Sequence, residues 1–123
     1  MGRLKQEMLD RTEVFADRML NVVQALEKNR VYGRIVDQMV GCGTSVGANT
    51  AEADQAVSSN DFCKTLGIVL KELGESRFWM RMCVRRRWFS SRALSGLQDE
   101  SLALSKILGS MVSRTRAKSR RTL

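Results

Sequence analysis

Residues 60–85 of this 123-residue chain read NDFCKTLGIVLKELGESRFWMRMCVR. Apolar or small side chains recur in this stretch at alternating spacings of four and three over three heptads, at Phe62, Leu66, Val69, Leu73, Ser76, Met80 and Cys83. These spacings follow the 3.6-residue period of an α-helix, whereas a strand would alternate at every second residue. The stretch therefore predicts an amphipathic helix, with N-cap side chains offered just before it by Ser58, Ser59 and Asn60.

The same period extends over most of the remaining chain. Residues 5–28, 32–56 and 95–117 each carry an apolar stripe, so each predicts a further helix. The stripes are Met8, Phe15, Met19, Val22 and Leu26; then Ile35, Met39, Cys42, Val46, Asn49 and Ala53; then Leu97, Leu104, Leu108 and Met111. Asn49 is the polar exception, so its amide must find partners inside the bundle or at an interface.

Four long helices with short connections must place neighbours antiparallel. The predicted fold is therefore all-α, an antiparallel up-down-up-down four-helix bundle that occupies residues 1–117 as a single domain. The chain has no Pro, so nothing interrupts long helices. The apolar stripe ends before Lys118, and residues 118–123 are expected to form a basic tail that frays.

The positive charge is concentrated in one part of the sequence. The net charge is +8; residues 1–75 hold 9 Lys/Arg against 11 Asp/Glu, while residues 76–123 hold 12 against 2. A basic excess confined to one region focuses electrostatic potential on a polyanion, so nucleic acid or an acidic protein is the expected partner. Arg outnumbers Lys fifteen to six, and its planar guanidinium suits phosphate.

Two groups of cations are the candidate nucleic-acid contacts. They are Arg77, Arg81, Arg85, Arg86, Arg87 and Arg92 around the end of the third helix, and Arg114, Arg116, Lys118, Arg120 and Arg121 at the end of the fourth. Antiparallel packing predicts two patches near opposite ends of the bundle. Trp79, Trp88 and Phe89 are interleaved with the first group and could stack on unpaired bases. The competing interpretation is a solvated face that complements helix dipoles, with the aromatic rings in the core.

Catalysis and cofactors are not expected. The chain has no His, which removes the commonest general base and metal ligand. Glu52, Glu72 and Glu75 could be acid/base carboxylates, but neither metal-ligand spacing nor a nucleophile–base pair accompanies them, so a polar network or inter-subunit pairing is the better interpretation. Small residues at Gly41, Gly43, Gly47, Ala48 and Ala51 indicate a closely approaching helix.

Compartment and partners follow from the cysteines and the N-terminus. Cys42, Cys63 and Cys83 are odd in number and lie within apolar patterns, which predicts buried thiols in a reducing compartment. The charged N-terminus begins an amphipathic pattern instead of a signal peptide, and no apolar stretch approaches membrane-spanning length. We therefore expect a cytoplasmic protein with no membrane contact.

The second and third helices carry a recognisable pattern. Ser45–Ala53 reads SVGANTAEA and resembles the S-I-P-A-N-I-A-E-G pattern of 23S rRNA intervening-sequence proteins, with Gly47 where Pro is common and Ala53 where Gly is common. The segment from Phe62 to Trp79 resembles the family's next helix. The motif residues carried over, as packing or interface positions, are Ser45, Gly47, Asn49, Glu52, Glu72 and Glu75.

Residues 77–81 and 106–111 are also similar to the accessory variability determinants of diversity-generating retroelements, which share this fold. That resemblance implies a homo-oligomer, a homopentamer, without enzymatic activity, that binds a reverse transcriptase and RNA. Together these patterns predict a ring-forming bundle that binds structured RNA, and DNA as a second polyanion, mainly through phosphate. The alternatives are a scaffold acting through protein–protein contacts and a purely structural oligomer.

Overall fold

Helix α3, Ser59–Arg85, carries the most regular stripe of the chain. All seven stripe residues predicted for it are buried. The helix begins where the cap predicts, because the Ser58 hydroxyl accepts a hydrogen bond from the Asp61 backbone N–H at 3.0 Å. Asp61 also places a carboxylate at the positive end of the helix dipole. The prediction of this element is confirmed along its whole length.

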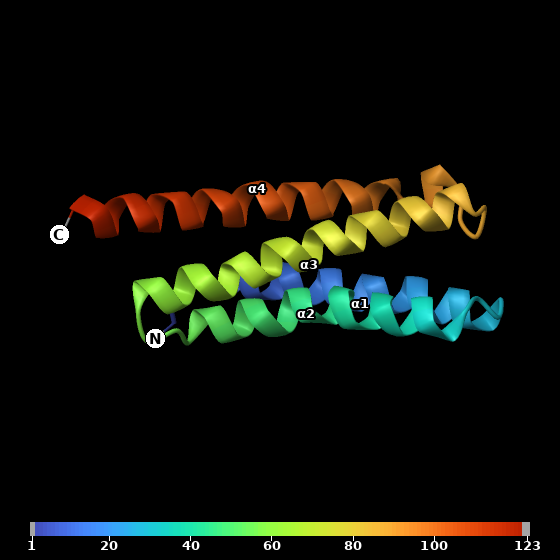
Figure 1. The fold of residues 1–123 in the computed structure, drawn as a ribbon, viewed down its shortest axis with the longest axis horizontal. Coiled ribbons are helices and arrows are strands. Elements are labelled where there is room, and N and C mark those ends of the chain that lie inside the picture. The colour runs from blue at the N-terminus through green and yellow to red at the C-terminus, as the bar shows by residue number, and fades with distance from the viewer. Residues whose placement is uncertain (1, 122–123) are drawn as a thin grey trace.

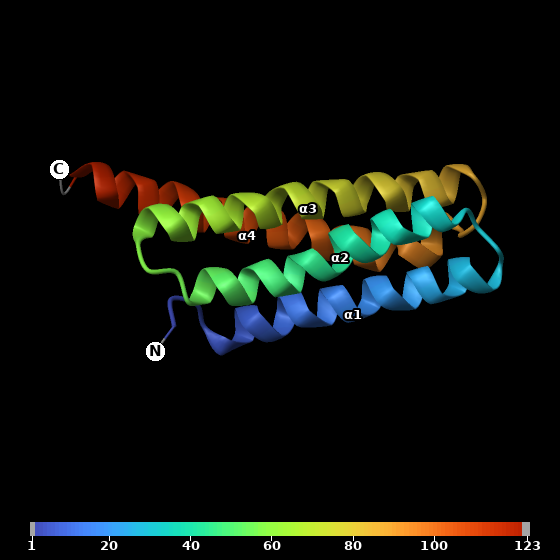
Figure 2. The ribbon, with the colours of Figure 1, turned by 60° about the horizontal axis from the view of Figure 1, so that its bottom comes forward.

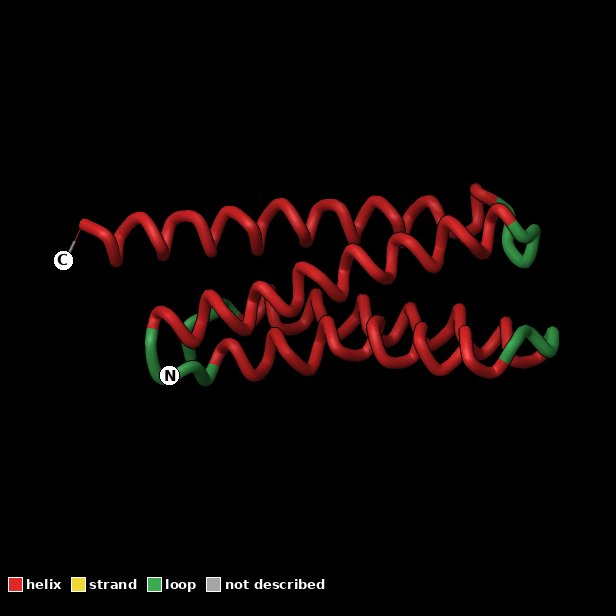
Figure 3. Tube along the Cα trace, in the orientation of Figure 1, coloured by secondary structure: helices red, strands yellow, loops and turns green. Residues whose placement is uncertain are grey.

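The computed structural model describes residues 2–121 and shows three further helices and no strand in that range (Figure 3). These are α1, Gln6–Lys28, α2, Gly33–Asp54, and α4, Ser91–Arg121. The first two match the predicted ranges to within two residues, whereas α4 extends four residues beyond its predicted range at each end. The prediction of an all-α four-helix fold is confirmed.

Helix α4 is longer than predicted because buried Leu94 and a polar cap support its start and cations support its end. At its start the Ser90 hydroxyl accepts a hydrogen bond from the Ala93 backbone N–H at 3.1 Å. At its end the helix continues through Lys118 to Arg121, where we had expected a frayed tail. Lysine and arginine are good helix formers and their cations stabilise the negative end of the helix dipole. Residues 122–123 of the predicted tail lie outside the described residues.

Successive helices pack side by side with alternating direction (Figures 1 and 2). The α1–α2 turn, residues 29–32, and the α3–α4 turn, residues 86–90, lie at the same end of the bundle, which we call the turn pole. The start of α1, the α2–α3 connection and the end of α4 lie at the opposite end, the terminal pole. This arrangement agrees with the predicted up-down-up-down order.

Two glycines of α2 let that helix approach α1 closely. A Cβ on Gly43 would lie 2.6 Å from Met19 Cβ, and one on Gly47 would lie 3.3 Å from the Thr12 carbonyl oxygen. Either methyl group would push the helices apart or force a side chain to move. Gly41 has nothing within 4 Å of its missing Cβ, so it takes no part in this contact. The predicted packing role of small residues therefore holds for Gly43 and Gly47 but not for Gly41.

The buried stripes of α2 and α4 differ from prediction by one position. Thr50 is fully buried and Asn49 is only half-buried, so placing Asn49 on the innermost stripe was wrong. Asn49 Nδ2 donates to the carbonyl oxygen of Ser45 at 3.1 Å, within its own helix. In α4, Val112 is buried in place of Met111. The three cysteines are buried free thiols, as predicted.

Candidate nucleic-acid interface

The predicted cations lie at both poles of the bundle. Ten of the eleven candidate residues are exposed, and Arg77 is the exception. Helix α3 ends at the turn pole and α4 ends at the terminal pole, so the two groups lie roughly 40 Å apart at 1.5 Å rise per residue over α3. The prediction of two separate patches is confirmed within one copy of the chain.

The turn pole gathers cations from both of its turns. The predicted members are Arg81, Arg85, Arg86, Arg87 and Arg92, all exposed. The α1–α2 turn and the helix ends beside it add three exposed cations that the sequence interpretation did not include, namely Lys28, Arg30 and Arg34. The two turns are in contact, because the rings of Tyr32 and Trp88 meet edge to face with their centroids 6.4 Å apart. The antiparallel order predicted from the sequence already implies that these two turns lie at the same end of the bundle.

Two arginines of this pole occupy a backbone conformation that favours glycine. Arg30 and Arg87 have φ of 57° and 61°, and among the described residues they are the non-glycine positions with positive φ. Each follows the C-cap of its helix, and the next residue closes a Schellman motif: the Val31 N–H donates to Leu26 O at 3.1 Å, and the Trp88 N–H to Cys83 O at 2.9 Å. A left-handed conformation costs an L-residue roughly 1–2 kcal/mol.

Arg77 faces α4 instead of solvent. Its Nη1 donates to the Ser101 hydroxyl at 2.9 Å, the Ser105 hydroxyl at 2.8 Å and, more weakly, the Ser101 carbonyl oxygen at 3.3 Å. Burial, and secondarily the charge of Arg81, lower the pKa of Arg77 from its usual value. The guanidinium therefore holds α3 to α4, and the structure separates Arg77 from the exposed cations with which the sequence grouped it.

The terminal pole carries the second predicted group. Its members project from the last turns of α4 beside the start of α3 and are all exposed: Arg114, Arg116, Lys118, Arg120 and Arg121. Arg116 and Arg120 line one shallow hollow with Ser59, and Arg3 from the N-terminal segment lines another with Lys118. Arg114 is partly engaged, since its Nη1 donates to the Ser110 hydroxyl at 2.9 Å. This pole is also a positively charged surface.

The aromatic side chains near the arginines mostly serve packing. Trp79, Trp88 and Phe89 are half-buried against the core, and the Trp79 indole N–H donates to Glu75 Oε2 at 3.4 Å. The structure therefore supports the interpretation that these rings pack against the core over the interpretation that they stack on bases. The well-exposed aromatic ring of the turn pole is Tyr32, with 66% of its surface accessible, which the sequence interpretation did not single out.

The six motif residues lie on α2 and α3 but form no reactive constellation. Ser45 and Asn49 pair within α2, Gly47 packs on α1 and Glu52 is exposed. On α3, Glu72 and Glu75 are half-buried; burial, and then the neighbouring charge of Glu75, raise the pKa of Glu72 above its usual value. Of the six, Gly47 therefore supports the contact between α1 and α2, and none of them belongs to the cations of the candidate interface.

Further chemistry is limited in the part of the chain that the structure describes. Within residues 2–121, no group of three or more Cys, Asp or Glu side chains could hold a metal ion. None of the helices there is long and apolar enough to cross a bilayer. Burial raises the pKa of Cys42 and of Cys83 to about 11 each, so these thiols are neutral at physiological pH.

Comparison with protein families matches residues 5–110 to the 23S rRNA-intervening sequence protein family. The chain belongs to this family. A similar solved structure is a protein of unknown function from the S23 ribosomal protein family of Bacteroides thetaiotaomicron; it is 30% identical, superposes with a TM-score of 0.81, and the match covers 85% of this chain and 97% of that one. A search of curated proteins found no significant match. The resemblance stated for the second and third helices is therefore confirmed at family level.

Proposed function

We propose that this family member is a non-enzymatic, homo-oligomeric protein that binds structured RNA through the cations of its turn pole. The observation that carries the proposal is the convergence of cations from two turns on one end of the bundle. Within residues 2–121 the single salt bridge joins Arg11 and Glu100, so no ion pair neutralises these cations. Their charge remains available to an external polyanion.

Phosphate contact explains this arrangement better than base reading does. Arginine forks suit phosphate oxygens, and the turn pole offers many of them with one exposed ring, Tyr32. Most of the affinity would come from counterion release, which is insensitive to sequence and strongly dependent on salt. Duplex DNA is then a second, weaker ligand. The terminal pole of the same copy is too far away to extend one continuous contact.

Self-association is the second part of the proposal. Large apolar side chains remain exposed on the helices and in the α2–α3 connection, and each is a candidate contact between copies: Val14, Leu20, Ile68, Phe78 and Leu102 on the helices, and Val57 in the connection. The resemblance favours a homopentamer, and a ring would bring the poles of several copies together. A monomeric mass at micromolar concentration, measured by light scattering, would refute this part and leave RNA binding by the single bundle to be judged separately.

The biological setting we propose is an RNA or a reverse transcriptase–RNA complex of a diversity-generating retroelement in the reducing cytoplasm. The support is the similarity of residues 77–81 and 106–111 to accessory variability determinants, together with the +8 net charge and the three free thiols. Neighbouring genes test the setting directly. A reverse transcriptase and a template repeat beside the gene would favour it, and an rRNA locus would favour the intervening-sequence setting.

Salt-titrated binding tests the function itself. Nuclease-treated protein is titrated against structured RNA, duplex DNA and heparin by fluorescence anisotropy at several salt concentrations. We expect preference for RNA and a log–log slope near −0.7 to −0.9 for each phosphate contacted. The variant Arg85→Glu with Arg86→Glu should flatten the slope by about two contacts. The matched control, Lys71→Glu with Lys106→Glu, makes the same charge change at exposed mid-bundle positions and should flatten it less.

Weak binding of all three polyanions, with equal losses in both double variants, would refute an RNA-binding turn pole. That outcome would favour the alternative, a scaffold that acts through protein–protein contacts.

A further inference from the structure

A groove lies between α1 and α4 on the side of the terminal pole. It has a volume of about 470 Å³ and is open to solvent along its outer side. Its floor is apolar and comes from three helices and the N-terminal segment, through Leu4, Met8, Phe62, Ile107 and Met111. Of these, Met8 and Phe62 are buried, and the other three are half-buried. These five side chains form a small apolar surface at the bottom of an open groove.

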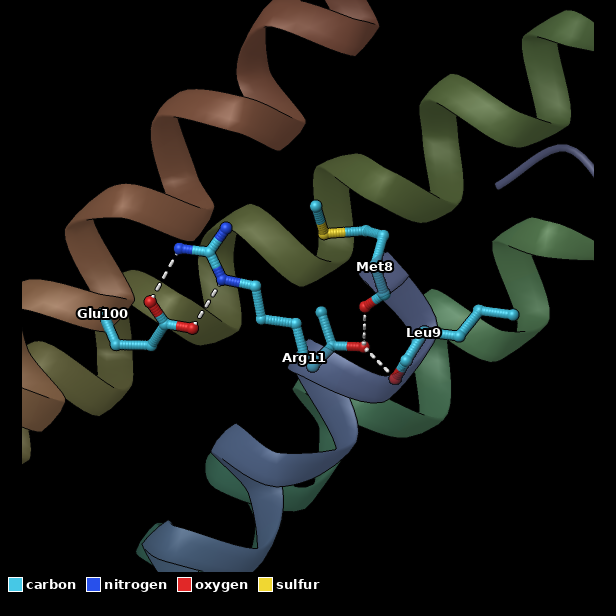
Figure 4. A network of polar contacts seen from close by, with 5 residues as sticks. Met8, Leu9, Arg11 and Glu100 are labelled. Atoms are coloured by element: carbon cyan, nitrogen blue, oxygen red, sulfur yellow. Dashed lines mark hydrogen bonds and ion pairs between the residues drawn. The ribbon is translucent and has the colours of Figure 1, made fainter. Parts of the chain in front are cut away.

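The groove exists because α4 packs on α3 and barely touches α1. The two helices are joined by Arg11, in the second turn of α1, whose Nε and Nη2 each donate to Glu100 at 2.8 Å (Figure 4). Between this ion pair and the terminal pole, the floor residues Met8 of α1 and Ile107 of α4 come from opposite sides of the groove, which stays open between the two helices. The ion pair thus fixes one end of a groove that runs along two helices.

The rim of the groove is positive. Arg3, Lys5 and Arg114 line it without a carboxylate partner, whereas Glu100 neutralises Arg11. Arg3 donates from Nε to the Ala56 carbonyl oxygen and keeps its charge. Glu7 is the acidic residue of the rim, so the charge left over is positive. An occupant must therefore present apolar groups to the floor and negative charge to both walls.

We propose that the groove binds an acidic amphipathic helix of a partner protein. A helix lying along α1 and α4 would place apolar side chains every third or fourth residue on the floor and carboxylates against the rim. A nucleic-acid backbone would pair with the rim cations but would leave the apolar floor uncovered. A small molecule would be left exposed along the open side, since small-molecule sites bury most of the ligand surface. The site is independent of the turn pole, and its proposal stands apart from RNA binding.

A designed peptide tests the site. The probe is a fluorescent helix of about 18 residues with leucine on one face and glutamate on both flanks. Its controls are a scrambled peptide of the same composition and a peptide with lysine in place of glutamate. Anisotropy should show binding of the first peptide only. Methyl resonances of Met8 and Met111 should shift on binding, because both side chains line the groove.

Two variants locate the contact. Ile107→Gln removes an apolar floor residue, and Lys5→Glu reverses a rim charge; each should weaken peptide binding at least about tenfold. Their matched controls are Ile35→Gln on α2, half-buried like Ile107, and the exposed Lys106→Glu on α4; both lie outside the groove and should change affinity less than about twofold.

Absence of peptide binding, or equal losses in the groove variants and their controls, would overturn the proposal. Concentration-dependent self-association that Ile107→Gln abolishes would overturn it too, because a second copy would then be the occupant. RNA affinity is measured in parallel on the same variants. Peptide binding that survives a failure to bind RNA would still support the groove.

Discussion

Replacing Arg77 should weaken the fold without weakening RNA binding. The substitution Arg77→Ala removes the guanidinium that joins α3 to Ser101 and Ser105 of α4. All three of its hydrogen bonds to α4 start from Nη1, which carries two hydrogens, so only two act at full strength and the 3.3 Å bond to the Ser101 carbonyl shares one of them. A net hydrogen bond contributes about 1 kcal/mol, and more for a charged donor.

Arg77→Ala should lower the free energy of unfolding by about 2 kcal/mol. The loss is not larger because the substitution does not leave every buried partner of the guanidinium without a hydrogen bond. The Ser101 hydroxyl keeps a partner after the substitution, because its Oγ donates to the Leu73 carbonyl oxygen at 3.2 Å. For a domain of this size about 2 kcal/mol lowers the melting temperature by roughly 6–10 °C. Calorimetry and equilibrium urea unfolding measure the loss, and Arg81→Ala, which removes an exposed cation one turn further along α3, is the matched control.

The same variants separate the structural from the RNA-binding role. Arg77→Ala should leave the salt slope of RNA binding unchanged, while Arg86→Ala should reduce it by about 0.7–0.9 and leave the melting temperature within about 1–2 °C. If Arg77→Ala melts like the unmodified protein and lowers the slope as Arg86→Ala does, the assignment of Arg77 to helix packing is refuted.

Further substitutions test other parts of the structure. Gly43→Ala should lower the free energy of unfolding in urea by about 1–3 kcal/mol, since the new methyl group would meet α1 at 2.6 Å, whereas Gly41→Ala meets nothing and should raise it by about 1 kcal/mol. Burial raises the pKa of Cys83 from 9.0 to about 11, so the neutral thiol stabilises the fold fully below pH 9 and this stabilisation is lost as the pH rises toward 11. Cys83→Ala should remove up to about 3 kcal/mol of this alkaline loss of stability. An unchanged stability–pH curve would contradict this prediction. Arg30→Gly and Arg87→Gly should each stabilise the fold by about 1 kcal/mol and weaken RNA binding in the salt titration.

The sequence predicts the helices well because each stripe reports burial directly. The stripe of α3 keeps its heptad spacing over three heptads and is buried throughout. In α2 the strict heptad spacing pointed to Asn49, but the adjacent Thr50 takes the inner position, while Ala53 of the same spacing is buried as predicted. The spacing alone does not decide between two adjacent residues near the edge of one helix face. The start of α4 was missed although Leu94 continues its apolar stripe, whereas its end was missed because a run of cations extends a helix without leaving an apolar signal.

The candidate site is less accessible to sequence reasoning because it depends on which turns meet. The arginines of the α3–α4 turn form a conspicuous run, whereas Lys28, Arg30 and Arg34 belong to a stretch of balanced charge and join them only through the antiparallel fold. Arg77 shows the opposite case, since its four-residue spacing to Arg81 is the spacing of a shared face. Small differences in helix rotation decide whether such a residue meets solvent or the next helix.

The cations of the turn pole have two candidate roles, helix stabilisation and phosphate binding, and their positions at the helix ends distinguish the two. Cations in the last turn of a helix, such as Lys28 and Arg85, stabilise the helix dipole, so they are expected in a protein that binds nothing. That argument does not extend to the left-handed positions that follow, where glycine is favoured and arginine costs stability. Arg30 and Arg87 occupy this position in both turns of the same pole. A recurring local cost at one end of the bundle supports the proposal that these guanidinium groups bind phosphate.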